Sequence, residues 1–242
     1  MSETTSPPPG ANAAKDRAIA LLKQHVVAMS ELSVGMVADG TRAMLTNDLP
    51  LAQSVMARDS QLDKFDIDIE TEAIRLIATL QPEGADLRTL GAVLKIGTCI
   101  DRVGRLGFDI AQNLTKGAMT MDHGPDQLLS DMDVKARAMV RQAIEAFSRN
   151  DADLAKAVFA LDDDVDALNQ QVTGRVIELL TAGGGLTAER LARDILVARH
   201  LERVADNACK VAEKAIYAIT GERRTEYFPA LAHRAPSGRV LP

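Results

Sequence analysis

The fold is decided by the stretch CIDRVGRLGFDIAQ, residues 99–112, and by the similar stretch HLERVADNACKVAE, residues 200–213. Each carries three charged residues at intervals of four, namely Asp101, Arg105 and Asp109 in the first and Glu202, Asp206 and Lys210 in the second. Residues four apart lie one turn apart on the same face of an α-helix. Apolar residues such as Val204 and Val211 stand beside the charged row. Each stretch therefore predicts a helix with an apolar face next to a line of charges.

The similarity extends to the preceding part of the chain. LAQSVMARDSQLD, residues 51–63, aligns with LAKAVFALDDDVD, residues 154–166, at a displacement of 103 residues, and the first two stretches align at 101. An Asn-Asp pair precedes each of these last two stretches, at 47–48 and at 150–151. Because the matches occur in the same order with nearly the same spacing, we infer a tandem duplication of one helical unit.

Apolar residues at intervals of three and four predict three helices in each copy. The predicted helices cover about 13–46, 50–80, 87–114, 126–149, 152–181 and 188–220. Pro, Gly and Asn-Asp sequences separate them, and short connections join antiparallel neighbours. The predicted fold is all-α, a tandem repeat of two antiparallel three-helix bundles.

This reading divides the chain into five parts. Residues 1–12 are rich in Ser, Pro, Gly and Ala and predict a disordered N-terminal arm. The first repeat covers 13–116, a glycine-containing linker covers 117–125, and the second repeat covers 126–221. The remaining residues, 222–242, lose the helical periodicity and predict a partly disordered tail.

Composition excludes several classes of protein. Aromatic residues make up 3% of the chain, so the core is built from aliphatic residues and Met, which suits packed helices. A net charge of −6 argues against a nucleic-acid binder. No apolar run is long enough to span a membrane, and the N-terminus has no signal-peptide pattern, so we expect a cytoplasmic protein. Cys99 and Cys209 have no CxxC spacing, which predicts buried free thiols.

Acidic pairs at intervals of four are the main candidate site. Asp59 and Asp63 form one pair, and Asp162 and Asp166 form the equivalent pair in the second copy. If the second helix of a copy lies against the third, the first pair comes close to Asp101. Such a cluster either binds a hard or borderline cation, pairs with internal Arg or Lys, or is simply solvated. The residues alone leave these alternatives open.

Catalytic patterns are absent from the sequence. No Glu has a His three residues later, as a di-iron bundle requires, and no GxGxxG, P-loop, HExxH or GxSxG sequence occurs. The glycine-rich GGGLT, residues 183–187, fits a turn between antiparallel helices. We therefore predict that the chain is not an enzyme. Its long amphipathic helices also suit a homodimer.

Two kinds of segment resemble the PhoU family of phosphate-transport regulators. DLRTLGAVLKIGTCIDRVGRLGFDIA, residues 86–111, and ARHLERVADNACKVAE, residues 198–213, are similar to the family's third-helix segment. RDSQLD, residues 58–63, and LDDDVD, residues 161–166, are similar to its D-x-x-x-D segment. The resemblance covers about residues 15–220, and it implies a tandem pair of three-helix bundles.

The resemblance also implies a function. Family members signal phosphate sufficiency from the cytoplasm, where they contact the ATPase subunit of the high-affinity phosphate ABC transporter and the sensor histidine kinase of the phosphate response. They restrain both, and they reach the membrane peripherally through these partners. Some members bind iron or zinc clusters through the acidic segments. The positions that match are Asp59, Asp63, Asp101, Asp109, Asp162, Asp166, Glu202 and Asp206.

Two positions depart from the family's acidic pattern. Arg105 stands in place of the second acid of the first copy, and Lys210 replaces an amide-bearing residue in the second. Either cation would neutralise its cluster without metal. We therefore expect a regulator of phosphate homeostasis, with a metal-binding helical bundle, holding iron, zinc, magnesium or manganese, as the alternative.

Overall fold

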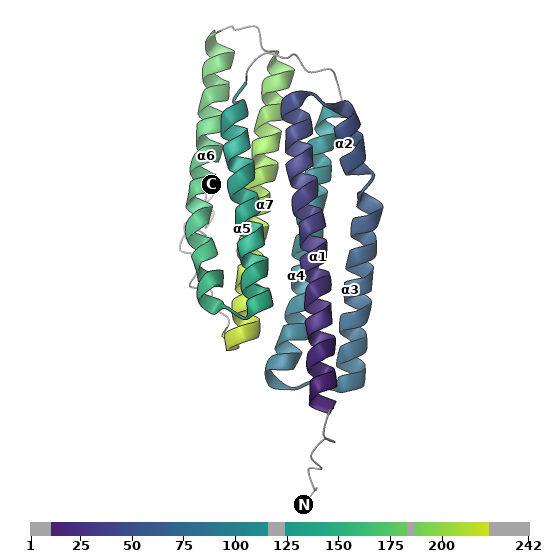
Figure 1. Ribbon diagram of the computed structural model, residues 1–242. Coiled ribbons are helices and arrows are strands. Elements are labelled where there is room, and N and C mark those ends of the chain that lie inside the picture. Colours follow the sequence, from purple (N-terminus) through teal and green to yellow (C-terminus); the bar gives the residue numbers. More distant parts are fainter. Residues whose placement is uncertain (1–10, 116–123, 183–186, 223–242) are drawn as a thin grey trace, which may run out of the picture.

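The structure, a computed structural model, describes residues 11–115, 124–182 and 187–222. These residues form helices and contain no strand, which confirms the all-α prediction (Figure 1). The helices are α1 (Ala11–Thr46), α2 (Leu49–Met56), α3 (Asp59–Leu80), α4 (Gly84–Thr115), α5 (Asp126–Arg149), α6 (Ala152–Ala182) and α7 (Ala188–Thr220).

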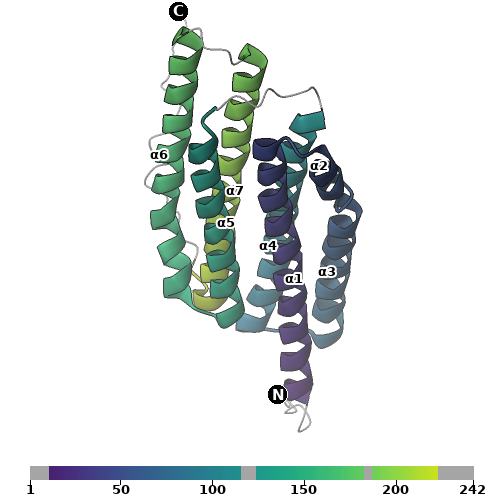
Figure 2. The same ribbon diagram turned by 45° about the horizontal axis from the view of Figure 1, so that its top comes forward.

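Two antiparallel bundles lie side by side with their long axes roughly aligned (Figures 1 and 2). The first contains α1 to α4 and the second contains α5 to α7. They pack together through α1 against α5 and through α4 against α7. α3 and α6 lie on opposite outer sides of this four-helix centre. The tandem repeat of helical bundles is thus confirmed.

The helix predicted over 50–80 is in fact two helices, α2 and α3. The backbone tightens at Ala57 and Arg58, where the Arg58 N–H donates to the carbonyl of Val55 at 3.0 Å instead of to a residue four back. The Arg58 guanidinium then pairs with Asp39 of α1 at 2.7 Å. The break contains no Gly or Pro, so the periodicity alone did not reveal it.

The duplicated Asn-Asp pair forms the same turn in both copies. Asn47 and Asn150 adopt left-handed backbone angles, with φ of 53° and 54°. Asn tolerates this region better than most side chains, so it ends a helix there. The carboxylate of Asp48 then accepts from the N–H of Leu51 at 2.9 Å, and that of Asp151 accepts from Leu154 at 2.9 Å. These N-caps start α2 and α6.

Several boundaries lie at or beyond the described residues. α1 begins at Ala11, inside the predicted disordered arm, because the Ala-rich start favours a helix. The rest of that arm, most of the predicted linker and residues 223–242 of the predicted tail lie outside the described residues. None of the described helices is both long and apolar enough to cross a bilayer. Cys99 and Cys209 are buried free thiols, as predicted.

The first bundle depends on a close backbone contact between α1 and α4. A Cβ atom placed on Gly107 would lie 2.6 Å from the backbone carbonyl carbon of Met36, and one on Gly40 would lie 2.6 Å from the carbonyl oxygen of Gly107. No side chain fits at either position without moving a helix. The equivalent residues of the second copy are Ala143 and Ala208, both fully buried.

We expect Gly107→Ala to destabilise the fold by about 1–3 kcal/mol, because the added methyl group meets rigid backbone. For a chain of this size this lowers the Tm by roughly 2–4 °C per kcal/mol. Gly174→Ala is the matched control, since a Cβ atom at this exposed position of α6 meets nothing within 4 Å. The control should gain about 0.5–1 kcal/mol from better helix propensity. Thermal unfolding of both variants tests this, and equal Tm values would contradict it.

Candidate functional site

The acidic residues of the first copy gather around one cation. This first acidic cluster consists of Asp59 and Asp63 on α3 and Asp101 on α4, with Arg105 at its centre. The guanidinium of Arg105 lies 3.3 Å from Asp59, 2.5 Å from Asp63 and 3.0 Å from Asp101. The bond to Asp101 is the main cause of the raised pKa of Arg105. Arg105 thus pairs with all three carboxylates and offsets one of their three negative charges.

A fourth carboxylate, Asp66, extends the first acidic cluster along α3. Burial raises the pKa of Asp66, and the charge of Asp101 raises it further. One oxygen of Asp101 is buried and accepts no hydrogen bond. We did not predict Asp66 as a site residue, although its place three residues after Asp63 continues the acidic row of α3 and could have revealed it.

The second copy contains an acidic cluster without a central arginine. This second acidic cluster consists of Asp162 and Asp166 on α6 and Asp206 on α7, all half-buried. None of the three forms an ion pair with any described residue. Burial raises the pKa of Asp162 to about 6, and the charges of Asp166 and Asp206 add to the effect. The cluster therefore holds negative charge that no described Lys or Arg offsets by direct pairing.

A buried thiol lies against the second acidic cluster. Cys209, one turn after Asp206 on α7, is 2% exposed. Burial raises the pKa of its thiol, as do the charges of Asp162 and Asp206. The thiol acts as a hydrogen-bond donor towards Asp162, which partly offsets the rise in the pKa of that carboxyl. Cys209 thus stays protonated and serves as a donor to the cluster.

The other candidate residues form no ion pair with the carboxylates or the arginine of the two clusters. Glu202 is buried, accepts from the side-chain amide of Asn169 at 3.1 Å and pairs with Arg199. Asp109 is half-buried and has neither an ion pair nor a hydrogen bond with the described part of the chain. Lys210 is exposed, does not pair with the second acidic cluster, and acts electrostatically on Cys99 of α4. The equal spacing of the two rows therefore does not produce equal sites.

The clusters differ in their fitness for a metal ion. In the first, Arg105 occupies the position from which a cation would contact the three carboxylates. In the second, three carboxylates supply the oxygen donors that hard cations prefer. Across residues 11–115, 124–182 and 187–222, no group of three or more His, Cys, Asp or Glu side chains is arranged to hold a metal ion. The second acidic cluster thus supplies suitable donor atoms, but the structure does not gather them around one point.

The fold and the two clusters define a class of duplicated helical-bundle proteins with an acidic cluster in each copy. A family model described as the PhoU domain matches residues 26–114 and again residues 129–215, once in each bundle. The chain belongs to the PhoU family.

Similar proteins support this assignment. The phosphate-specific transport system accessory protein PhoU homolog of Caulobacter vibrioides (strain NA1000 / CB15N) is 32% identical over 220 residues, covering 88% of this chain and 93% of that protein. A protein of the same name from Aquifex aeolicus (strain VF5) is 33% identical over 204 residues, with 83% and 90% covered.

Solved structures have the same fold. The crystal structure of PhoU from Pseudomonas aeruginosa superposes with a TM-score of 0.77 at 27% identity, covering 86% of this chain and 99% of that one. The phosphate transport system regulatory protein PhoU from Streptococcus pneumoniae superposes with a TM-score of 0.79 at 20% identity, covering 87% and 99%. The arrangement of the bundles is therefore that of the family.

We expect the charge of Asp162 to destabilise the metal-free fold above pH 6. The folded-state pKa of about 6 lies above the ordinary 3.8, so ionisation favours the unfolded chain as the pH rises through this window. Asp162→Asn should therefore raise stability at pH 8 by about 1–2 kcal/mol after allowance for solvent screening. The gain should fade towards pH 4, where Asp162 is protonated.

Thermal unfolding between pH 4 and pH 8, with a chelator present, measures this gain. Asp163→Asn, at an exposed neighbouring position, is the control and should change the Tm little. A gain that does not depend on pH would contradict the argument, because it would not come from the charge of Asp162.

Proposed function

We propose that the protein is a cytoplasmic, non-enzymatic regulator of phosphate homeostasis. In this proposal it restrains the high-affinity phosphate ABC transporter and the phosphate-responsive sensor kinase when phosphate is sufficient. The main support for this proposal is that both bundles match the PhoU domain. Relatives above 30% identity are also named phosphate-specific transport system accessory proteins. A regulator of this kind needs stable surfaces for partners more than a reaction centre.

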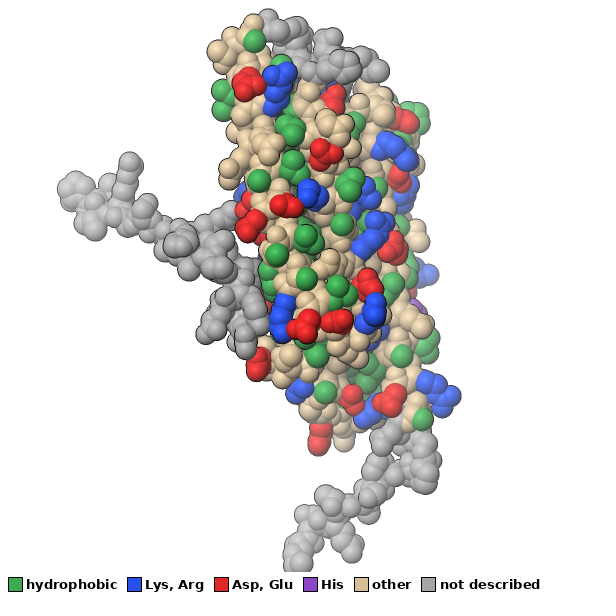
Figure 3. Space-filling view, turned by 60° about the vertical axis from the view of Figure 1, so that its left-hand side comes forward, with side chains coloured by type: hydrophobic (Ala, Val, Ile, Leu, Met, Phe, Trp, Pro, Cys, Tyr) green, Lys and Arg blue, Asp and Glu red, His purple; other side chains and the backbone are tan. Residues whose placement is uncertain are grey.

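The surface of the bundle suits protein contacts. On the face that carries α6, charged side chains of both signs are interspersed with apolar ones (Figure 3). Ile74 of α3 and Ile177 of α6 occupy equivalent positions of the two copies and are 52% and 57% exposed. The second acidic cluster adds uncompensated negative charge, which would attract a basic patch on a partner. We propose the transporter's ATPase subunit, the sensor histidine kinase and a second copy of this chain as partners.

Deletion of the gene tests the regulatory role directly. In cells grown at high phosphate, we expect a phosphate-starvation reporter to be active and phosphate uptake to continue without shutting off. Complementation with the wild-type gene should restore both responses, and the Gly174→Ala variant should do so equally well. Unchanged reporter activity and uptake, in a strain without a second gene of this family, would contradict the proposal.

A second candidate function is cation binding at the second acidic cluster. The observation that favours it is the group of three half-buried carboxylates without an ion-pair partner among the described residues. A divalent cation would relieve the mutual repulsion of Asp162, Asp166 and Asp206. Iron, zinc, magnesium and manganese are the ions to compare, and the first acidic cluster serves as an internal contrast because Arg105 already fills it.

We expect Asp206→Arg to remove any metal response, because it reproduces in the second copy the cation that Arg105 supplies in the first. The metal-free protein is loaded with each ion in turn, and the Tm is measured. Wild type should gain Tm with ion concentration, since a ligand that binds the folded state stabilises it by mass action. Asp206→Arg should start from a higher Tm and gain nothing.

Asp68→Asn, which removes an exposed acid of α3, is the control and should respond to metal like the wild type. A wild-type Tm that is independent of all four ions would exclude this second function.

A further inference from the structure

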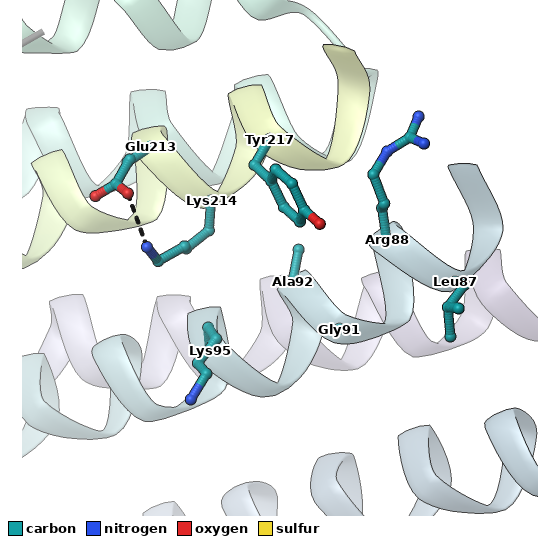
Figure 4. Close-up of a pocket in the computed structure, with 8 residues that line it drawn as sticks. All are labelled: Leu87, Arg88, Gly91, Ala92, Lys95, Glu213, Lys214 and Tyr217. Carbon is teal, nitrogen blue, oxygen red and sulfur yellow. Dashed lines mark hydrogen bonds and ion pairs between the residues drawn. The ribbon is translucent and has the colours of Figure 1, made fainter. Parts of the chain in front are cut away.

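A cleft of about 460 Å³ lies between α4 and α7, at the junction of the two bundles (Figure 4). Its wall on α4 includes Arg88, Gly91 and Lys95, and its wall on α7 includes Lys214 and Tyr217. Small-molecule sites in proteins commonly have volumes of roughly 300–1,000 Å³ and often lie between domains. The cleft is thus large enough for a ligand of nucleotide size and larger than bare phosphate needs.

The cleft is positively charged, although the chain as a whole carries a net charge of −6. Arg88, Lys95 and Lys214 contribute three cations, and the acid Glu213 pairs with Lys214 at 2.9 Å. Neither Arg88 nor Lys95 forms an ion pair or hydrogen bond with another described side chain. Two cations therefore remain available to an anion that enters from solvent.

The Arg88 side chain is held against the C-terminal end of α7. Its Nε atom is buried and has no hydrogen-bond partner in the described structure. Its guanidinium packs close to Gly221, where an added Cβ atom would lie 3.4 Å from the Arg88 Cζ. Because the Nε atom is closed to solvent, a ligand in the cleft would instead meet the Nη groups of the same guanidinium. Phosphate oxygens are the acceptors that a guanidinium binds best.

An apolar surface lies beside these cations. The ring of Tyr217 extends from α7 across the gap towards Ala92 of α4 (Figure 4). Gly91 leaves the surface of α4 bare, since a Cβ atom there would meet nothing within 4 Å. A flat ring or a carbon chain of a ligand could lie between the aromatic side chain and this bare helix. The cleft therefore offers apolar contact together with positive charge.

The helical fold does not require Arg88, Gly91 or Lys95, because the second copy has other residues at the aligned positions. At the displacement of 101 residues that aligns the third helices, Arg88 corresponds to Glu189 and Lys95 corresponds to Leu196. Gly91 corresponds to Ala192 in the same alignment. The same helix thus folds in the second copy with an acid and an apolar residue at the two positions. The positive charge belongs to this cleft and not to the bundle as such.

We propose that the cleft binds a small phosphorylated molecule of nucleotide size. Its phosphate groups contact Arg88, Lys95 and Lys214, and its organic part lies against Tyr217 and the bare helix at Gly91. The ligand touches both bundles, so it stabilises their contact. This binding is a property of the purified chain and does not depend on the regulatory role proposed above.

The test uses the purified full chain and titration calorimetry with ATP, AMP, adenosine and inorganic phosphate, without divalent metal. We expect ATP to bind at least tenfold more tightly than inorganic phosphate, adenosine to bind most weakly, and affinity to fall as salt is added. Inorganic phosphate that binds as tightly as ATP would overturn the proposed ligand size. Absence of saturable binding by ATP up to millimolar concentration would overturn the site.

Three variants test whether ATP binds in this cleft. Lys95→Glu reverses an exposed charge that has no partner in the described structure, so it should fold normally and weaken ATP binding at least tenfold. Gly91→Leu keeps every charge and fills the cleft, and it should weaken binding similarly. Lys64→Glu is the control, because Lys64 is an exposed lysine of α3 away from the cleft. Equal affinity in Lys95→Glu and Lys64→Glu would place the nucleotide elsewhere and contradict the proposal.

Discussion

The packing of α4 against α7 is the contact on which the rest of the structure depends. Both helices are buried along most of their length, and every other long helix packs against one of them. Each acidic cluster takes one member from this central pair, Asp101 with Arg105 from α4 and Asp206 from α7. The positively charged cleft lies between the same two helices. A shift of α4 relative to α7 would therefore change the geometry of both acidic clusters and of the cleft.

Much of the fold follows from the sequence, because hydrophobic periodicity and turn chemistry are local. The Asn-Asp pairs at 47–48 and 150–151 predicted turns that the structure contains in both copies. The break between α2 and α3 was not predictable in this way, since it contains no Gly or Pro and involves an ion pair from Arg58 to Asp39. That partner is distant in the sequence, and periodicity carries no information about it.

The site was predictable in its residue types but not in its pairing. The same spacing places Arg105 and Lys210 in two similar rows. Arg105 nevertheless meets three carboxylates, whereas Lys210 forms no ion pair with a described residue and acts electrostatically on Cys99. Glu202 likewise belongs to a buried contact with Asn169 rather than to the second acidic cluster. Which residues of a helical row meet a neighbouring helix depends on how far the two helices are shifted along their axes. Tertiary packing fixes this shift, and a single sequence does not show it.

Duplication followed by divergence explains the final arrangement of charge. The two copies share their turns and their bundle geometry, so a substitution in one copy changes its electrostatics without changing the scaffold. Arg105 turned the first acidic cluster into an ion-pair network, whereas the equivalent Asp206 adds a third carboxylate to the second. In the same way, Lys95 lines the cleft while the aligned position of the second copy is Leu196. A chain of net charge −6 thereby separates an uncompensated negative site from a positive one along α7, and each attracts ligands that the other repels.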